Sequence, residues 1–181
     1  MKGLKTILII STGLGNTGSL KNALNHLGFK WKIVSKFNEE ELNINSFQGF
    51  ILPGVGSFES GMRKLKDGNL DQLINKLVEK NIPGMGICLG MQMMVNSSEE
   101  GKSNEKGLGL FQGNVKKLPN TIDPVPNVGW SKTSSNCKDR ILRKLLNNDF
   151  YYIHSYAVQL HNPKEIAATF EHYPTGQHSD I

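Results

Sequence analysis

The first half of the chain alternates short apolar runs with helical patterns, and this alternation restricts the fold more than any other feature. The expected strands are residues 6–11, 30–35, 47–54 and 82–87. The expected helices are residues 19–28, 59–80 and 88–97, the second with a break at the "DGN" of residues 67–69. Strands that alternate with helices pair in parallel, because each helix returns the chain to the same end of the sheet. The sequence therefore predicts an α/β fold, with a mostly parallel sheet and helices on both faces.

After about Gly107 the pattern changes to strands and turns. The apolar runs here are residues 113–118, 124–130, 150–160 and 165–172, with one helix expected near residues 140–147. No internal repeat, low-complexity tract or linker separates the two halves. We therefore expect a single domain over residues 1–181, in which the second half adds an antiparallel extension to the sheet.

Charge and cysteine content exclude several classes of function. The net charge is +5, but the lysines are scattered, whereas a nucleic-acid surface needs clustered basic residues with stacking aromatics. Two cysteines, Cys88 and Cys137, are too few for a disulfide framework and indicate a reducing compartment. The apolar "ILII" of residues 7–10 is too short for a signal peptide, and no run approaches the length of a membrane span. We expect a cytoplasmic protein that binds neither membrane nor nucleic acid, with Cys137 an ordinary thiol.

The first turn contains a glycine spacing that is typical of dinucleotide sites. Gly13, Gly15 and Gly18 follow a strand and precede a helix, in the order G-x-G-x-x-G. Such a site also needs an acidic residue at the end of the second strand, where this chain has Ser35 and Lys36. The pattern is therefore interpreted as a packed turn, not as a nucleotide site.

The most informative motif is G-x-C-x-G around Cys88, between an expected strand and an expected helix. It has the design of the G-x-S-x-G nucleophile elbow, in which a sharp turn raises the nucleophile above the sheet edge. The amide of Leu89 is then placed to stabilise an oxyanion, and a second glycine-rich turn with Gly54 and Gly56 could supply another amide. A buried structural cysteine is the alternative, but glycines on both sides favour a nucleophile.

These motifs, together with "GNTGSLKNAL", "SSEEG", "KGLGLFQGNVKKL", "VPNVGW" and "YYIHSY", resemble those of class I (triad-type) glutamine amidotransferases. Within that family the chain is similar to HisH-like glutaminase subunits of imidazole glycerol phosphate synthase. The resemblance implies a flavodoxin-like fold, Cys88 as the catalytic nucleophile, and glutamine hydrolysed through a thioester without metal or cofactor. It implies an oxyanion hole from Val55 and Leu89. The implied glutamine-binding residues are Gly54, Gly56, Gln92, Glu100, His154, Ser155 and Tyr156. Ammonia would pass to a (β/α)8-barrel cyclase (HisF-like) in a heterodimer.

The resemblance ends near Thr169, and residues 171–181 form a divergent tail. The family's general base lies in a "QFHPE"-like turn, and no such motif occurs in these residues. Three interpretations remain: a truncated or frameshifted remnant, which we favour; His172 or His178 as an unusual base; or a catalytically dead binding partner. Asn127 also departs from the family, which usually has histidine there.

Other functions would keep the same motifs. The same glutaminase chemistry could serve a sugar acceptor in a surface-polysaccharide pathway. A non-catalytic binding module would not need Cys88 at all. A cysteine peptidase is disfavoured, because "SSEEG" and "YYIHSY" fit a glutamine pocket.

Overall fold

The computed structural model describes residues 6–101, 105–119, 125–134, 148–171 and 178–180. The chain divides into two compact units, Met1–Met94 and Val95–Ile181. The expected helix at residues 140–147 lies outside the described residues. The single-domain assignment remains a prediction.

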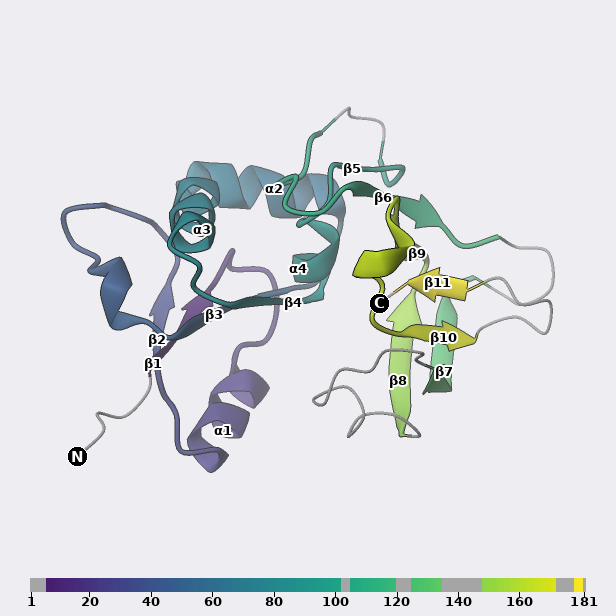
Figure 1. Ribbon diagram of the computed structural model, residues 1–181, viewed down its shortest axis with the longest axis horizontal. Helices are drawn as coiled ribbons and strands as arrows, with labels where there is room; N and C mark the ends of the chain where they lie inside the picture. Colours follow the sequence, from purple (N-terminus) through teal and green to yellow (C-terminus); the bar gives the residue numbers. More distant parts are fainter. Residues whose placement is uncertain (1–5, 102–104, 120–124, 135–147, 172–177, 181) are drawn as a thin grey trace. The chain divides into compact units, whose positions relative to one another are not determined.

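The first unit contains a parallel four-stranded sheet in the order β2-β1-β3-β4 (Figure 1). Its strands are β1 (Thr6–Ile10), β2 (Lys30–Val34), β3 (Gly49–Gly54) and β4 (Gly84–Cys88). Its α-helices are α1 (Gly18–His26), α2 (Phe58–Asp67), α3 (Leu70–Glu79) and α4 (Leu89–Gln92), and a 3-10 turn covers Ile44–Ser46. These positions confirm the predicted order of strands and helices, including the break between α2 and α3.

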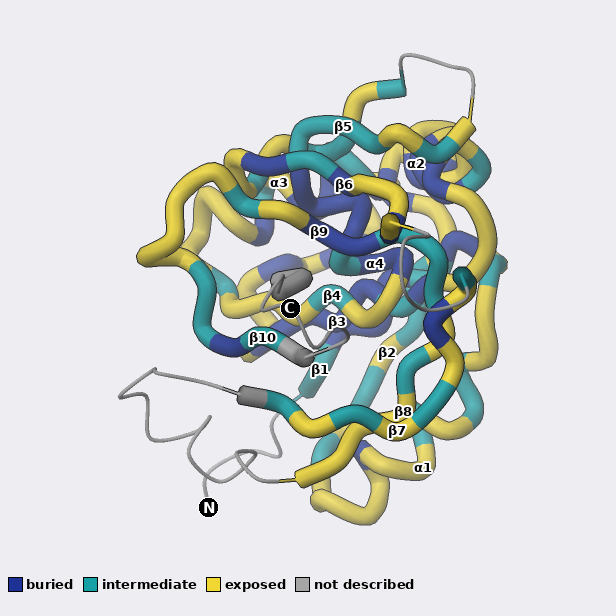
Figure 2. The backbone as a smooth tube through the Cα atoms, turned by 90° about the vertical axis from the view of Figure 1, so that its right-hand side faces the viewer, coloured by how far each residue is buried: buried dark blue, intermediate teal, exposed yellow. Residues whose placement is uncertain are grey.

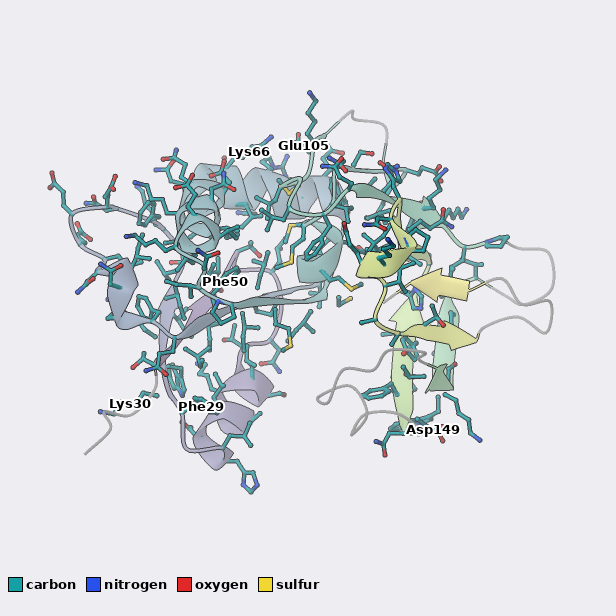
Figure 3. All side chains as sticks on the ribbon, in the orientation of Figure 1. Phe29, Lys30, Phe50, Lys66, Glu105 and Asp149 are labelled. Carbon is teal, nitrogen blue, oxygen red and sulfur yellow. The ribbon has the colours of Figure 1, made fainter. Side chains whose placement is uncertain are left out.

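The core of this unit occupies both faces of the sheet, because alternate strand residues point to opposite sides. On the α1 side, Ile9, Leu24 and Ile51 are buried together, with Phe29 and Trp31 packed against them. The opposite face buries Leu8, Ile10, Phe50 and Leu52 beneath α2 and α3 (Figures 1 and 3). Figure 2 shows β1 and β3 as the buried centre of the sheet. Helices therefore cover both faces, as the alternation predicts.

The helix after Cys88 is shorter than expected: α4 ends at Gln92 instead of continuing to Ser97. The reason lies in the hydrogen bonds of Asn96. Its N–H donates to the Gly113 carbonyl over 3.0 Å, and its side-chain oxygen accepts from the Gly113 N–H over 2.9 Å. Asn96 belongs to the second unit and is held there by Gly113, so the helix does not continue to Ser97.

The second unit forms its own mostly antiparallel sheet instead of extending the first one. Its seven described strands lie in the order β5-β6-β9-β11-β10-β7-β8. They are β5 (Ser97–Ser98), β6 (Gly113–Lys117), β7 (Asn127–Ser134), β8 (Asp149–His154), β9 (Tyr156–Leu160), β10 (Thr169–Glu171) and β11 (His178–Asp180), with a 3-10 turn at Pro163–Glu165. The run predicted over residues 150–160 is two strands that meet at Ser155. The divergent tail supplies β11.

Candidate active site

Cys88 lies at the carboxyl end of β4, where the chain turns sharply into α4. Its backbone has φ 54° and ψ −118°, a conformation that residues with a Cβ rarely adopt. Such a conformation costs about 1–3 kcal/mol and persists only where the surrounding packing imposes it. The thiol is exposed. The predicted strand-to-helix elbow is therefore present, with its cysteine at the strained position.

Two glycines allow α4 to approach the sheet so closely. A Cβ at Gly90 would lie 1.7 Å from the Leu52 carbonyl oxygen of β3. A Cβ at Gly86 would lie 2.5 Å from the Met91 Cα. No side chain fits at either distance, so the G-x-C-x-G pattern is a direct requirement of this packing. The same packing holds Cys88 in its strained conformation.

The loop after β3 lies beside the cysteine. Gly54 is the register partner of Cys88 in the parallel sheet, and a Cβ on Gly54 would lie 3.2 Å from the Cβ of Leu89. Val55, the next residue, is 55% exposed, and Gly56 has a φ of +101°. The two amides predicted to bind an oxyanion therefore belong to adjoining segments. Their role remains a prediction.

Gln92 ends α4, is 8% exposed and takes part in an interaction within the protein. It lies one helical turn beyond Cys88. The first unit thus brings together six of the residues predicted from the sequence. They are Gly54, Val55, Gly56, Cys88, Leu89 and Gln92.

Glu100 lies in the second unit, in the turn that follows β5. Its N–H donates to the Ser98 hydroxyl over 3.0 Å. The preceding Glu99 donates its N–H to the Val115 carbonyl over 2.9 Å and pairs with Lys116 over 3.2 Å. The turn is therefore fixed to β6, and Glu100 is half-buried.

His154, Ser155 and Tyr156 form the corner between β8 and β9. His154 Nδ1 lies 3.0 Å from the Tyr156 carbonyl oxygen, which can only accept, so Nδ1 carries the proton. His154 Nε2 then accepts from the Asn127 amide over 3.2 Å. The Ser155 carbonyl accepts from the Leu118 N–H over 2.9 Å. The His154 ring therefore fixes the corner, and its two nitrogens are both engaged.

Sequence reasoning missed this positioning role of His154. The available signal was Asn127, noted only as a departure from the family. Asn127 is 5% exposed, and its amide is a buried polar group that needs a partner. Cys137 and His172 lie outside the described residues, and His178 begins β11.

Within the described residues, no three His, Cys, Asp or Glu side chains gather as a metal ion requires. In the same part of the chain, no helix combines the length and apolarity that crossing a bilayer demands.

Comparisons with known proteins agree with this geometry. The family model for class I glutamine amidotransferases matches residues 8–181. An imidazole glycerol phosphate synthase subunit HisH 2 from Methanococcus maripaludis is 42% identical over 170 residues, which cover 92% of this chain and 81% of that protein. The HisH subunit from Leptospira interrogans is 38% identical over 166 residues, covering 88% and 78%.

Among solved structures, a glutamine amidotransferase aligns with a TM-score of 0.63 at 18% identity. The alignment covers 91% of this chain and 84% of the other. At that identity the likeness concerns the fold alone. The names of the relatives do not favour the polysaccharide or binding-only alternatives.

Proposed function

The chain belongs to the class I glutamine amidotransferase family, as an enzyme of the HisH type, and from this premise we propose that it supplies ammonia for imidazole glycerol phosphate synthesis. Glutamine is hydrolysed to glutamate at Cys88, in one domain that includes both units. The observation that carries the proposal is the conformation of Cys88, an exposed thiol on a strained turn beside two glycine-rich segments.

The proposed reaction has two steps. The Cys88 thiolate attacks the side-chain amide carbon of glutamine, and the new C–S bond pushes electrons onto the carbonyl oxygen. The amides of Val55 and Leu89 stabilise this oxyanion, after which the C–N bond breaks and the nitrogen leaves as ammonia with an added proton. Water then attacks the thioester, glutamate leaves, and the thiol is restored.

The remaining predicted residues hold the substrate in this proposal. Glu100 pairs with the ammonium group of glutamine, and Gln92 holds the same end of the molecule. The backbone of the 154–156 corner binds the substrate carboxylate, while Gly54 and Gly56 let the loop approach closely. His154 is not proposed as the base, because both of its ring nitrogens are already bonded. His172 and His178 remain the candidates predicted from the sequence.

A cyclase subunit is the proposed acceptor of the ammonia, since the relatives carry names of subunits of a synthase. One face of the β7–β8 pair is suited to such a partner. Val128 pairs with Ile153, and Trp130 pairs with Tyr151, so these four side chains share one face. Their exposed fractions are 52%, 66%, 71% and 54%. An exposed apolar face with a central tryptophan is typical of a protein interface, and we name it the Trp130 face.

The test is glutamine hydrolysis, measured as glutamate release with and without a HisF-type cyclase. Cys88→Ser should abolish release, while Cys137→Ser, at the other cysteine of the chain, should retain it. A diazoketone analogue of glutamine should label Cys88, and free glutamine should slow the labelling. Equal release by the protein and its Cys88→Ser variant would refute the proposal, as would labelling that glutamine does not affect.

A further inference from the structure

Two adjacent glutamates follow β5, and only one of them has a role in the proposed function. Glu100 is proposed to pair with the ammonium group of glutamine, whereas Glu99 has no role in that proposal. Both residues lie in the turn of residues 98–100, which we call the 98–100 turn. It leaves β5 beside β6, the neighbouring strand of the second sheet (Figure 1). The contacts of Glu99 with β6 indicate what this residue does.

Glu99 is bonded to three successive residues of β6. Its N–H donates to the Val115 carbonyl over 2.9 Å. Its Oε1 lies 3.2 Å from the Lys116 Nζ, and its Oε2 accepts from the Lys117 N–H over 3.4 Å. Both carboxylate oxygens are therefore engaged within the protein, so this side chain is poorly suited to bind the ammonium group of a substrate. Glu99 instead connects the 98–100 turn to β6.

The residues before Glu99 are fixed to the same strand. Ser97 and Ser98 are the register partners of Asn114 and Val115 in the parallel β5–β6 pair. The Ser97 hydroxyl donates to the Asn114 side-chain oxygen over 2.7 Å. The Ser98 hydroxyl accepts from the Glu100 N–H over 3.0 Å. Glu100 therefore follows directly on a segment that is fixed to β6 at each residue.

The same end of β6 holds the corner that is proposed to bind the substrate carboxylate. Lys117 is the register partner of Tyr156 in the antiparallel β6–β9 pair, and the Leu118 N–H donates to the Ser155 carbonyl over 2.9 Å. An amino acid carries its ammonium and carboxylate groups on one carbon, so the protein groups that bind them must be held at a fixed separation. Residues 115–118 contact both segments and can set this separation.

We propose that Glu99 is a positioning residue for Glu100: its bonds to Lys116 and Lys117 fix the 98–100 turn to the strand that also holds the 154–156 corner. This role rests on the proposed function, which assigns Glu100 to the ammonium group of glutamine. The Glu99 and Lys116 side chains are 52% and 45% exposed, so their ion pair contributes little to global stability. Loss of the pair releases the 98–100 turn without unfolding the protein.

The experiment measures ligand binding by calorimetry in Cys88→Ser protein, which leaves glutamine intact. The two ligands are glutamine and 5-amino-5-oxopentanoate, which is glutamine without its α-amino group. Lys116→Glu places a like charge opposite Glu99. We expect this change to raise the Kd for glutamine by about fivefold, the upper range for an exposed pair, and to leave the Kd for the analogue unchanged. Adding Glu99→Lys reverses both charges and should recover most of the affinity for glutamine.

The matched control is the ion pair between Glu39 and Lys76 in the first unit, which is also exposed and includes no predicted site residue. Lys76→Glu should leave the Kd of both ligands unchanged. An unchanged Kd for glutamine in Lys116→Glu overturns the proposal. Equal rises for the two ligands also overturn it, because the effect would then not pass through the ammonium group. So does a charge swap that recovers no affinity.

A second measurement does not depend on ligand binding. In protein labelled with ¹⁵N-glutamate, the Glu100 amide signal is assigned by its loss in Glu100→Gln. We expect this signal to shift and its N–H to exchange faster with solvent in Lys116→Ala, and both to stay unchanged in Lys76→Ala. An unchanged Glu100 signal in Lys116→Ala overturns the proposal. If this signal responds to Lys116→Ala but the Cys88→Ser protein binds no glutamine, the proposed function fails and the link from Lys116 to Glu100 stands.

Discussion

Replacing Cys88 by glycine should stabilise the fold relative to replacing it by alanine. Both substitutions remove the thiol, so the difference between them reports only the backbone. At φ 54° and ψ −118° the Cβ of alanine keeps the strain of the native residue, and glycine releases it. The strain is about 1–3 kcal/mol. The greater freedom of glycine in the unfolded chain offsets about 0.5–1 kcal/mol of this.

The net expectation is that Cys88→Gly is more stable than Cys88→Ala by about 1 kcal/mol, or roughly 2–4 °C in Tm for a chain of this size. Urea unfolding measures the difference as a shift of the midpoint at constant slope. The thiol is exposed, so lost burial contributes little.

Met85 provides the matched control, because it lies on the same strand, is 52% exposed and has no positive φ. At this position the alanine variant should be more stable than the glycine variant by about 0.5–1 kcal/mol, because glycine in a strand is destabilising relative to alanine. If Cys88→Ala also proves more stable to urea than Cys88→Gly, the backbone of the elbow is not strained and the reasoning about it fails.

Three further substitutions test the packing, the interface and the corner. Gly90→Ala should destabilise by about 3 kcal/mol or more in urea unfolding, because its Cβ would lie 1.7 Å from the Leu52 carbonyl oxygen; a loss under about 1 kcal/mol would contradict that packing. Trp130→Ala should weaken cyclase binding by about 2 kcal/mol in calorimetry, as for a central interface tryptophan, and unchanged affinity would exclude the Trp130 face. His154→Ala should lower the free energy of unfolding by about 1–3 kcal/mol and raise KM for glutamine, because it leaves the buried Asn127 amide of β7 unpaired. As a control, replacing the exposed His161 by alanine should change the free energy of unfolding by no more than about 0.5 kcal/mol.

The strained elbow and its packing illustrate how function and stability are linked here. Gly90 allows α4 to lie directly on β3, and this close approach maintains the conformation of Cys88. The strained backbone conformation lowers the stability of the fold, and the same conformation places the exposed Cys88 next to the 54–56 loop. A variant that relaxes the elbow gains stability and loses the geometry on which the proposed chemistry depends.

Local sequence pattern determined the elements of the first unit. Apolar runs such as "ILII", which are short and rich in β-branched residues, favour buried strands. The glycine and asparagine of "DGN" end one helix before the next begins. The G-x-C-x-G motif identified the elbow, because only glycine fits beside a nucleophile at such a turn. These features depend on a few neighbouring residues, and periodicity and sterics encode them directly.

Tertiary contacts decided the rest. The length of α4 depends on hydrogen bonds between Asn96 and Gly113, which are far apart in sequence. The tautomer of His154 depends on Asn127 across two strands. The close approach of Gly90 in α4 to Leu52 in β3 joins two βα units. Such pairings form only when the whole chain is folded. Residue type and spacing therefore predicted the chemistry, whereas the fold determined where each residue lies and what it contacts.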